Sequence, residues 1–316
     1  MQKIKKDQFS NRSILSIDQF TPDSLNYVFS EASSLIAEHE RGVVHNNLNG
    51  KIVTLLFYEP SSHTFSSFSS AVKRMGAQTL EYQNPTSTSS YVKGETMEDT
   101  IRVFANYSDC IVMRHFTTGI VKKLAKIIDV PMINAGDGSG EHPTQALLDM
   151  FTLYRRFGRL HNLKGLIAGD LLYGRTVHSL IKGLGKYQGN TLYLLAPEKL
   201  KLPLYVEKEI KRLKIKVEYI KDEKDIPKDC HFWYWTRVQK ERFSDPEEYE
   251  KLKNSFIITP RLLKQRGNAD MVIMHPLPRI GEIDIKIDKD PRALYLSTQV
   301  KNGMYIRMAL LKLVLG

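Results

Sequence analysis

Short apolar segments with strand character alternate with amphipathic helical segments along almost the whole chain. Residues 51–60 form an apolar run rich in strand formers, and residues 61–76 follow with helical spacing and end at Gly76. The same order continues to residue 157 and begins again near residue 163. Strands that alternate with helices predict mostly parallel sheets covered by helices on both faces. We therefore expect an α/β protein with two such domains.

Length and composition agree with two ordinary globular domains. The chain has 316 residues, of which 42% are hydrophobic and 26% charged, and only two cysteines, Cys110 and Cys230. Two cysteines exclude a disulfide framework and a cysteine-based zinc site, and the nine histidines include no HExxH motif or closely paired set, so no metal is expected. No apolar run approaches the roughly 18 residues that span a bilayer, and no signal-peptide core follows the basic start. We expect a cytoplasmic protein with no membrane partner.

The formal net charge of +11 admits two interpretations. One is a basic surface for nucleic acid, and the other is a site that gathers small anionic molecules. Lysines between residues 199 and 240 fall at helical spacings that are typical of solvated faces. No zinc finger, RNA-binding motif or basic tail is present. The sequence therefore favours small anions, and not nucleic acid, as partners.

Polar motifs follow several predicted strands, at the end where ligands bind in open α/β sheets. Ser61–Thr64 (Ser-Ser-His-Thr) follows strand 51–60 at a helix N-terminus, where free N–H groups and the helix dipole favour an anion. A plain helix cap is the alternative interpretation. Arg114, at the end of strand 110–115, can hold an oxyanion with two donors or form a surface ion pair.

The longest polar motif runs from Asn134 to Gln145. Its glycines permit tight turns, and His142 and Gln145 lie one turn apart at the start of the next helix. A histidine at a helix N-terminus is biased toward its neutral form, which can donate a hydrogen bond to a carbonyl oxygen. A capped loop with a structural histidine is the alternative, which the length and composition of the motif disfavour.

Three motifs in the second half offer further binding groups. Segment 169–178 places Arg175 at a strand-to-helix turn, but it is not the glycine fingerprint of a dinucleotide site. Arg237 and Gln239 follow the aromatic strand 231–235. Both arginines are suited to hold carboxylates. In segment 275–279, prolines free backbone carbonyls from sheet pairing, so that they can accept a hydrogen bond from an amine.

Together these motifs resemble the aspartate carbamoyltransferase catalytic chain of the aspartate/ornithine carbamoyltransferase superfamily. The resemblance rests on NAGDGSGEHPTQALLD, GDLLYGRTVHSL, TRVQKERF and MHPLPRIGEI in this order, and it extends from about residue 12 to the C-terminal helix. Ornithine carbamoyltransferases would carry a cysteine in the segment occupied here by His-Pro-Leu-Pro. The resemblance implies transfer of the carbamoyl group from carbamoyl phosphate to L-aspartate, giving N-carbamoyl-L-aspartate and phosphate for pyrimidine biosynthesis, without a cofactor.

The resemblance also implies an architecture and partners. It implies a carbamoyl-phosphate-binding domain at 1–146 plus 300–316 and an aspartate-binding domain at 147–299, joined by two interdomain helices. It further implies a homotrimer whose active sites are shared between subunits. The resemblance leaves open whether regulatory chains or multienzyme partners are present.

Site roles follow from the resemblance position by position. The groups around the reacting carbamoyl are Thr64, Arg114, His142 and Gln145. The carbamoyl phosphate ligands are Ser61, Ser62, His63, Thr64 and Arg114, with Ser89 and Lys93 reaching from a neighbouring subunit. The aspartate ligands are Arg175, Arg237 and Gln239, with the Leu277 carbonyl near the reacting amine.

Several positions depart from the family pattern. The phosphate motif is normally Ser-Thr-Arg-Thr, so His63 replaces a permanently charged fork of donors. Phe65 stands at a position that is often polar or basic, Leu172 stands where the family usually has lysine, and segment 294–299 is one residue out of register. These changes leave two alternatives open. One is a non-catalytic or weakly active member that acts as a structural or regulatory subunit, and the other is a different acceptor amine or carbamoyl donor.

Overall fold

The computed structural model describes residues 8–85, 93–243, 245–253 and 255–316, and the chain divides into two compact units. Unit 1 comprises Met1–Leu148 and Lys301–Gly316, and unit 2 comprises Asp149–Val300. The chain leaves unit 1 inside helix α5 (Pro143–Phe157) and returns inside helix α10 (Thr298–Leu315). Two α/β units with two connecting helices are the architecture that the sequence predicts.

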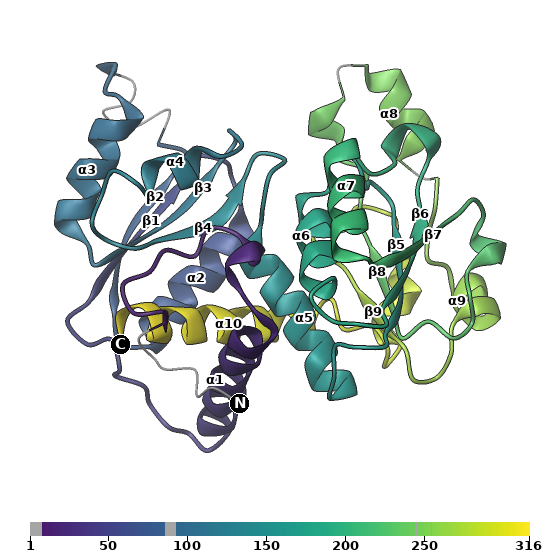
Figure 1. The fold of residues 1–316 in the computed structure, drawn as a ribbon, viewed down its shortest axis with the longest axis horizontal. Helices are drawn as coiled ribbons and strands as arrows, with labels where there is room; N and C mark the ends of the chain where they lie inside the picture. The colour runs from purple at the N-terminus through teal and green to yellow at the C-terminus, as the bar shows by residue number, and fades with distance from the viewer. Residues whose placement is uncertain (1–7, 86–92, 244, 254) are drawn as a thin grey trace. The chain divides into compact units, whose positions relative to one another are not determined.

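Unit 1 is built on a four-stranded sheet in the order β2-β1-β3-β4 (Figure 1). Every ladder in it is parallel, so the carboxyl ends of the strands meet at one edge. Its strands are β1 (Ile52–Phe57), β2 (Gln78–Gln83), β3 (Cys110–His115) and β4 (Met132–Asp137). Its helices, besides parts of α5 and α10, are η2 (Ile17–Gln19), α1 (Pro22–Glu40), α2 (Ser62–Arg74), α3 (Met97–Tyr107) and α4 (Ile120–Leu124).

Helices cover both faces of the unit 1 sheet. On one face, Phe65 of α2 packs edge-on against Phe57 of β1, with ring centroids 5.2 Å apart. On the other face, Ile101 of α3 and Leu124 of α4 share a buried cluster with Leu56. Neighbouring strand residues point to opposite faces, so Leu56 and Phe57 each anchor one helical layer.

Unit 2 is built on a five-stranded, all-parallel sheet in the order β7-β6-β5-β8-β9 (Figure 1). The β8 residues Trp233 and Trp235 are fully buried in a cluster with Leu262 of α9. Its strands are β5 (Lys164–Ala168), β6 (Thr191–Leu195), β7 (Lys216–Ile220), β8 (Phe232–Trp235) and β9 (Val272–Met274). Its helices are α6 (Arg175–Leu184), η4 (Glu198–Leu200), α7 (Leu204–Leu213), η5 (Glu223–Asp225), η6 (Lys240–Arg242), α8 (Pro246–Leu252), α9 (Pro260–Arg266) and η7 (Ile285–Lys289).

The elements differ from the predicted pattern at a few places. Helix α1 is not among the predicted elements, although Thr21 forms a capping box with Ser24 and Pro22 occupies the first turn. The C-terminal helix begins at Thr298, four residues before the predicted Asn302. The first difference is a whole helix that was not predicted, and the second concerns where a helix begins, which local caps and packing decide.

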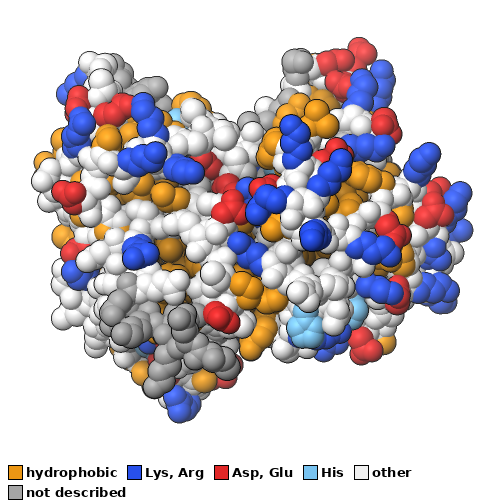
Figure 2. Space-filling view, viewed as in Figure 1, with side chains coloured by type: hydrophobic (Ala, Val, Ile, Leu, Met, Phe, Trp, Pro, Cys, Tyr) orange, Lys and Arg blue, Asp and Glu red, His pale blue; other side chains and the backbone are white. Residues whose placement is uncertain are grey.

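Within the described residues, no helix is long and apolar enough to cross a membrane. Cys110 and Cys230 are both buried and free. On the face in Figure 2, Lys and Arg side chains are interspersed with Asp and Glu side chains. The net positive charge is therefore spread over that face and does not gather into one patch.

Candidate active site

The first half-site lies at the carboxyl edge of the unit 1 sheet. Phe57 at the end of β1 pairs with Arg114 of β3, and the Tyr58 N–H donates to the Arg114 carbonyl at 2.9 Å. The Gly138 N–H donates to the His115 carbonyl at 2.8 Å, which joins the loop after β4 to the end of β3. Parallel pairing thus brings the three predicted motifs of unit 1 to one edge.

Helix α2 begins with open backbone donors. Ser61 occupies the N-cap position, but its hydroxyl does not make the capping hydrogen bond expected of it. Ser62 and His63 are exposed in the first turn, and Thr64 is buried. An uncapped N-terminus with two flanking hydroxyls suits an oxyanion, because its N–H groups and dipole lack a side-chain partner.

The two departures near this helix have different structural consequences. Phe65 is only 7% exposed and packs into the core against Phe57. The site that is often polar or basic in the family is therefore part of the core in this chain. His63 is exposed, so its imidazole is available to a ligand at the helix N-terminus.

Arg114 is largely buried and paired. Its Nη2 atom donates to Oε1 of Glu59 at 2.7 Å, and its side chain is 11% exposed. Its Nη1 atom lies 3.5 Å from the Ala135 carbonyl oxygen. Glu59 is the second residue after β1, so the pair joins the ends of two adjacent strands. Glu59 compensates the guanidinium charge and fixes its direction.

A buried carboxylate shapes the loop that carries His142 and Gln145. Asp137 accepts hydrogen bonds from the Gly119 N–H at 2.7 Å, the Glu141 N–H at 3.0 Å and the Asn134 amide at 3.2 Å. The loop ends at His142, which directly precedes α5. His142 and Gln145 are 3% and 8% exposed, and the Gln145 N–H donates to the His142 carbonyl at 3.0 Å.

The second half-site lies at the carboxyl edge of the unit 2 sheet, where two loops are joined. Gly169 has φ +108°, and a Cβ there would lie 2.0 Å from the Thr236 carbonyl oxygen, so only glycine permits this approach. The Asp170 N–H donates to Thr236 Oγ1 at 3.0 Å. The Asp170 carboxylate is fully buried and accepts from the N–H groups of Tyr173 at 2.9 Å and Gln239 at 3.4 Å.

The two predicted carboxylate ligands start from these joined loops. Arg175 begins α6 directly after Gly174. Arg237 follows β8, and its guanidinium makes two hydrogen bonds to Glu241, four residues on. Burial raises the pKa of Asp170, while the N–H groups of Tyr173 and Gln239 that donate to it act in the opposite direction. Asp170 therefore connects both arginine-bearing segments.

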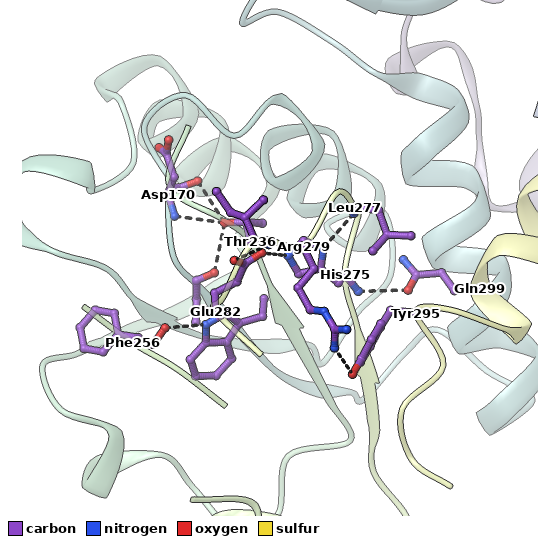
Figure 3. Close-up of polar contacts among 12 residues, drawn as sticks. Asp170, Thr236, Phe256, His275, Leu277, Arg279, Glu282, Tyr295 and Gln299 are labelled. Atoms are coloured by element: carbon purple, nitrogen blue, oxygen red, sulfur yellow. Dashed lines mark hydrogen bonds and ion pairs between the residues drawn. The ribbon is translucent and has the colours of Figure 1, made fainter. Parts of the chain in front are cut away.

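Hydrogen bonds around His275 fix the backbone at Leu277 (Figure 3). The Leu277 N–H donates to His275 Nδ1 at 2.8 Å, so the neutral imidazole carries its proton on Nε2, which lies 2.7 Å from Glu282 Oε1. The His275 N–H donates to Gln299 Oε1 at 3.0 Å. Leu277 has φ +56°, an uncommon conformation for leucine that these contacts hold in place.

Two ionisable groups in this loop are strongly affected by burial. Burial lowers the pKa of His275, against the raising effect of Glu282. Burial alone would raise the pKa of Glu282, but the close contact with the His275 imidazole holds it below its usual range. Arg279 of the same motif donates hydrogen bonds to Asp288 and Tyr295, and these contacts give it a structural role.

Two predicted residues belong to the loop after β2. Ser89 lies outside the described residues. Lys93 is described and exposed. Sequence reasoning missed the acidic residues that orient the site, which are Glu59, Asp137, Asp170 and Glu282. Their positions directly after strands or inside the quoted motifs are the only signal that could have found them. Among described residues, no group of three or more metal-ligating side chains occurs.

Comparison with known proteins gives one consistent family. The profile of the aspartate/ornithine carbamoyltransferase carbamoyl-P binding domain matches residues 12–155, and that of the Asp/Orn binding domain matches residues 161–314. An aspartate carbamoyltransferase catalytic subunit of Methanopyrus kandleri is 41% identical, covering 98% of both chains. That of Clostridium acetobutylicum is 44% identical, covering 96% of this chain and 98% of the relative.

A solved structure agrees with this result. Aspartate transcarbamoylase from Trypanosoma cruzi, in complex with carbamoyl phosphate and aspartate, superposes with a TM-score of 0.91 at 36% identity, covering 98% of each chain. Profiles, relatives and structure each span nearly the whole chain. The chain therefore belongs to the aspartate/ornithine carbamoyltransferase family, among its aspartate carbamoyltransferases.

Proposed function

We propose that this chain transfers the carbamoyl group of carbamoyl phosphate to L-aspartate, giving N-carbamoyl-L-aspartate and phosphate in pyrimidine biosynthesis. The aspartate nitrogen forms a bond to the carbamoyl carbon, the bond from that carbon to the phosphate oxygen breaks, and one amine proton is released. The observation that carries the proposal is the retention, at strand ends, of groups for two different anions. Unit 1 binds carbamoyl phosphate, and unit 2 binds aspartate.

On the donor side, each group has a role that fits its setting. The open first turn of α2 binds the phosphate, with Ser61, Ser62 and Thr64 adding hydroxyl donors and His63 an imidazole. Arg114 and His142, with Thr64, donate to the carbamoyl oxygen, where negative charge grows in the tetrahedral transition state. Gln145 accepts from the carbamoyl NH₂ group. Burial of Arg114 and His142 strengthens their interaction with that charge.

On the acceptor side, the two carboxylates of aspartate are bound by Arg175 and Arg237, with help from Gln239. Arg237 exchanges one carboxylate partner for another when it leaves Glu241 for the substrate. The backbone carbonyl of Leu277, held by the His275 contacts, accepts a hydrogen bond from the amine and orients its lone pair.

We propose a cytoplasmic homotrimer in which Ser89 and Lys93 complete the site of a neighbouring subunit. Free buried cysteines agree with a reducing compartment. Exposed apolar side chains on α3, Val103 at 42% and Tyr107 at 58%, offer contact area to a second copy close to the segment that carries Lys93.

One observation favours a second candidate, a non-catalytic or weakly active member with a structural or regulatory role. The phosphate site offers an exposed imidazole at His63 in place of a guanidinium, and Phe65 is committed to the core. Both changes weaken the donor side while leaving the acceptor side intact.

Two measurements on the full chain decide between the candidates. The first is formation of carbamoyl-aspartate from carbamoyl phosphate and L-aspartate, identified by mass, with L-ornithine and other amines as alternative acceptors. The second is calorimetric titration with N-(phosphonacetyl)-L-aspartic acid, a ligand held by a T. cruzi relative. Product together with tight binding supports the enzyme. Tight binding without product points to a reaction with another substrate. If there is neither product nor tight binding, the proposed function is refuted in favour of the non-catalytic candidate.

A further inference from the structure

A small apolar cluster in unit 2 surrounds Leu172, the residue that replaces the usual lysine. We call it the Leu172 cluster. Its members are the buried residues Leu200, Val238 and Tyr249 and the partly buried Leu172, Tyr173, Phe243 and Leu252. These residues come from the turn after β5, from η4, from the segment after β8 and from α8. The cluster therefore joins three stretches that are separate in the sequence, at residues 172–173, at Leu200 and at residues 238–252.

Polar contacts with Asp170 hold the beginning of the segment that carries Arg237. Asp170 binds the N–H of Gln239 at 3.4 Å, and Thr236 is bonded to Asp170. The main-chain N–H of Leu171 donates to the Leu200 carbonyl at 3.0 Å, which fixes the turn against η4. Beyond Gln239, apolar contacts of the Leu172 cluster return the chain to this turn.

Helix α8 depends on the same cluster for its anchorage. Tyr249 is its one buried residue, at 6% exposure. Its ring packs against Phe243, with centroids 5.9 Å apart, and Lys199 of η4 pairs with Glu248 at the surface. An exposed ion pair contributes little, so apolar packing supplies most of the attachment.

The substitution at position 172 fits this packing. A leucine in the turn packs against the buried group of Leu200, Val238 and Tyr249, whereas an ammonium group there would have to leave the cluster to stay hydrated. The change removes a cation beside the aspartate ligands and gives, in exchange, a fixed support for the segment between Thr236 and Leu252.

We propose that Leu172 is a positioning residue, which holds the backbone of segment 236–252, and with it the backbone of Arg237, in place before aspartate arrives. The proposal rests on the proposed function of Arg237 as a carboxylate ligand. A segment that is already ordered costs less to order on binding, so the benefit appears in the affinity for aspartate. The benefit is equal for bound substrate and transition state, and therefore the KM for aspartate changes while kcat does not.

The test compares Leu172→Ser with the conservative Leu172→Met and with Leu204→Ser as a matched control. Leu204 is 75% exposed at the start of α7 and is not a member of the cluster. For Leu172→Ser we expect the KM for aspartate to rise about tenfold, and kcat and the KM for carbamoyl phosphate to change less than about twofold. Leu172→Met and Leu204→Ser should match the parent. An unchanged aspartate KM, an equal rise in Leu172→Met, or a loss confined to kcat would overturn the proposal.

Hydrogen exchange gives a readout that does not need activity. Leu172→Ser should speed amide exchange in 238–252 and leave the strands of both sheets as in the parent, while Leu204→Ser should not. If Leu172→Ser does not fold, Phe243→Ser removes a partner from the other side of the cluster and should give the same two effects. If the parent is inactive but Leu172→Ser exchanges faster than the parent in 238–252, only the proposed function is refuted. If Leu172→Ser exchanges in 238–252 at the rate of the parent, the role of Leu172 is refuted.

Discussion

Replacing His63 with arginine tests whether the altered phosphate motif limits this chain. His63 is exposed in the first turn of α2, where Ser61 leaves the backbone N–H groups uncapped. An arginine there adds a permanent charge and a fork of donors to a site that already has oriented N–H groups. The change does not enter the core, so the fold is expected to stay as it is.

The size of the expected gain in binding free energy for carbamoyl phosphate depends on how exposed position 63 is. Two unit charges about 4 Å apart attract by about 1 kcal/mol in water and by about 4 kcal/mol at an effective dielectric constant of about 20. Because position 63 is exposed, the gain should lie near the lower value, at about 1–2 kcal/mol for a charge-assisted hydrogen bond. A gain of that size corresponds to about a 5- to 30-fold lower KM for carbamoyl phosphate.

The assay is steady-state formation of carbamoyl-aspartate at several carbamoyl phosphate concentrations. His161→Arg, which adds the same charge at an exposed position of unit 2, is the matched control. The reasoning is wrong if His63→Arg binds no more tightly than the parent, or if His161→Arg improves equally.

Three further predictions concern residues that support the site. Phe65→Ala should lower the free energy of unfolding by about 3–4 kcal/mol in urea titrations, because it empties a buried aromatic position. Asp137→Ala should reduce kcat by about 10- to 100-fold while carbamoyl-aspartate stays the product, because three donors that shape the loop before His142 lose their acceptor. Folded His275 and Glu282 both bind protons less readily than in the unfolded chain, so stability should fall as pH drops, first below about 6.5 and then below about 4.3. Glu282→Gln should flatten the curve of stability against pH below about pH 4.3, and an unchanged curve would contradict the pairing of Glu282 with His275.

The order of strands and helices in this fold could be predicted because each element has a clear local pattern. The run from Ile52 to Phe57 is apolar and rich in strand formers, and the start of α2 is rich in hydroxyl residues. Helix α1 was within reach of the same reasoning, since Thr21 and Pro22 are its start signals. The order of strands within each sheet was not, because it depends on pairing between segments far apart in sequence.

In the candidate site, too, some residues could be predicted from the sequence and others could not. Residues at strand ends, such as Arg114 and Arg237, could be named from the sequence because parallel sheets place such residues at one edge. Their partners could not be named. Glu59 meets Arg114 only because β1 and β3 are neighbours, and the contacts of Leu172 exist only because the segment after β8 returns over the turn after β5. Side-chain pairing across strands is a tertiary property, and no local pattern encodes it.

The three departures from the family pattern differ in what the fold does with them. Phe65 and Leu172 exchange a polar role for an apolar one, and in each case the structure surrounds the side chain with apolar partners. His63 has no such compensation, because it is exposed at the point where the phosphate is expected to bind. Packing has thus adjusted to two of the changes, and the third reduces positive charge on the donor side alone. The binding of carbamoyl phosphate, and not that of aspartate, should therefore limit turnover in this chain, and a KM for carbamoyl phosphate well below cellular supply in the parent would contradict that conclusion.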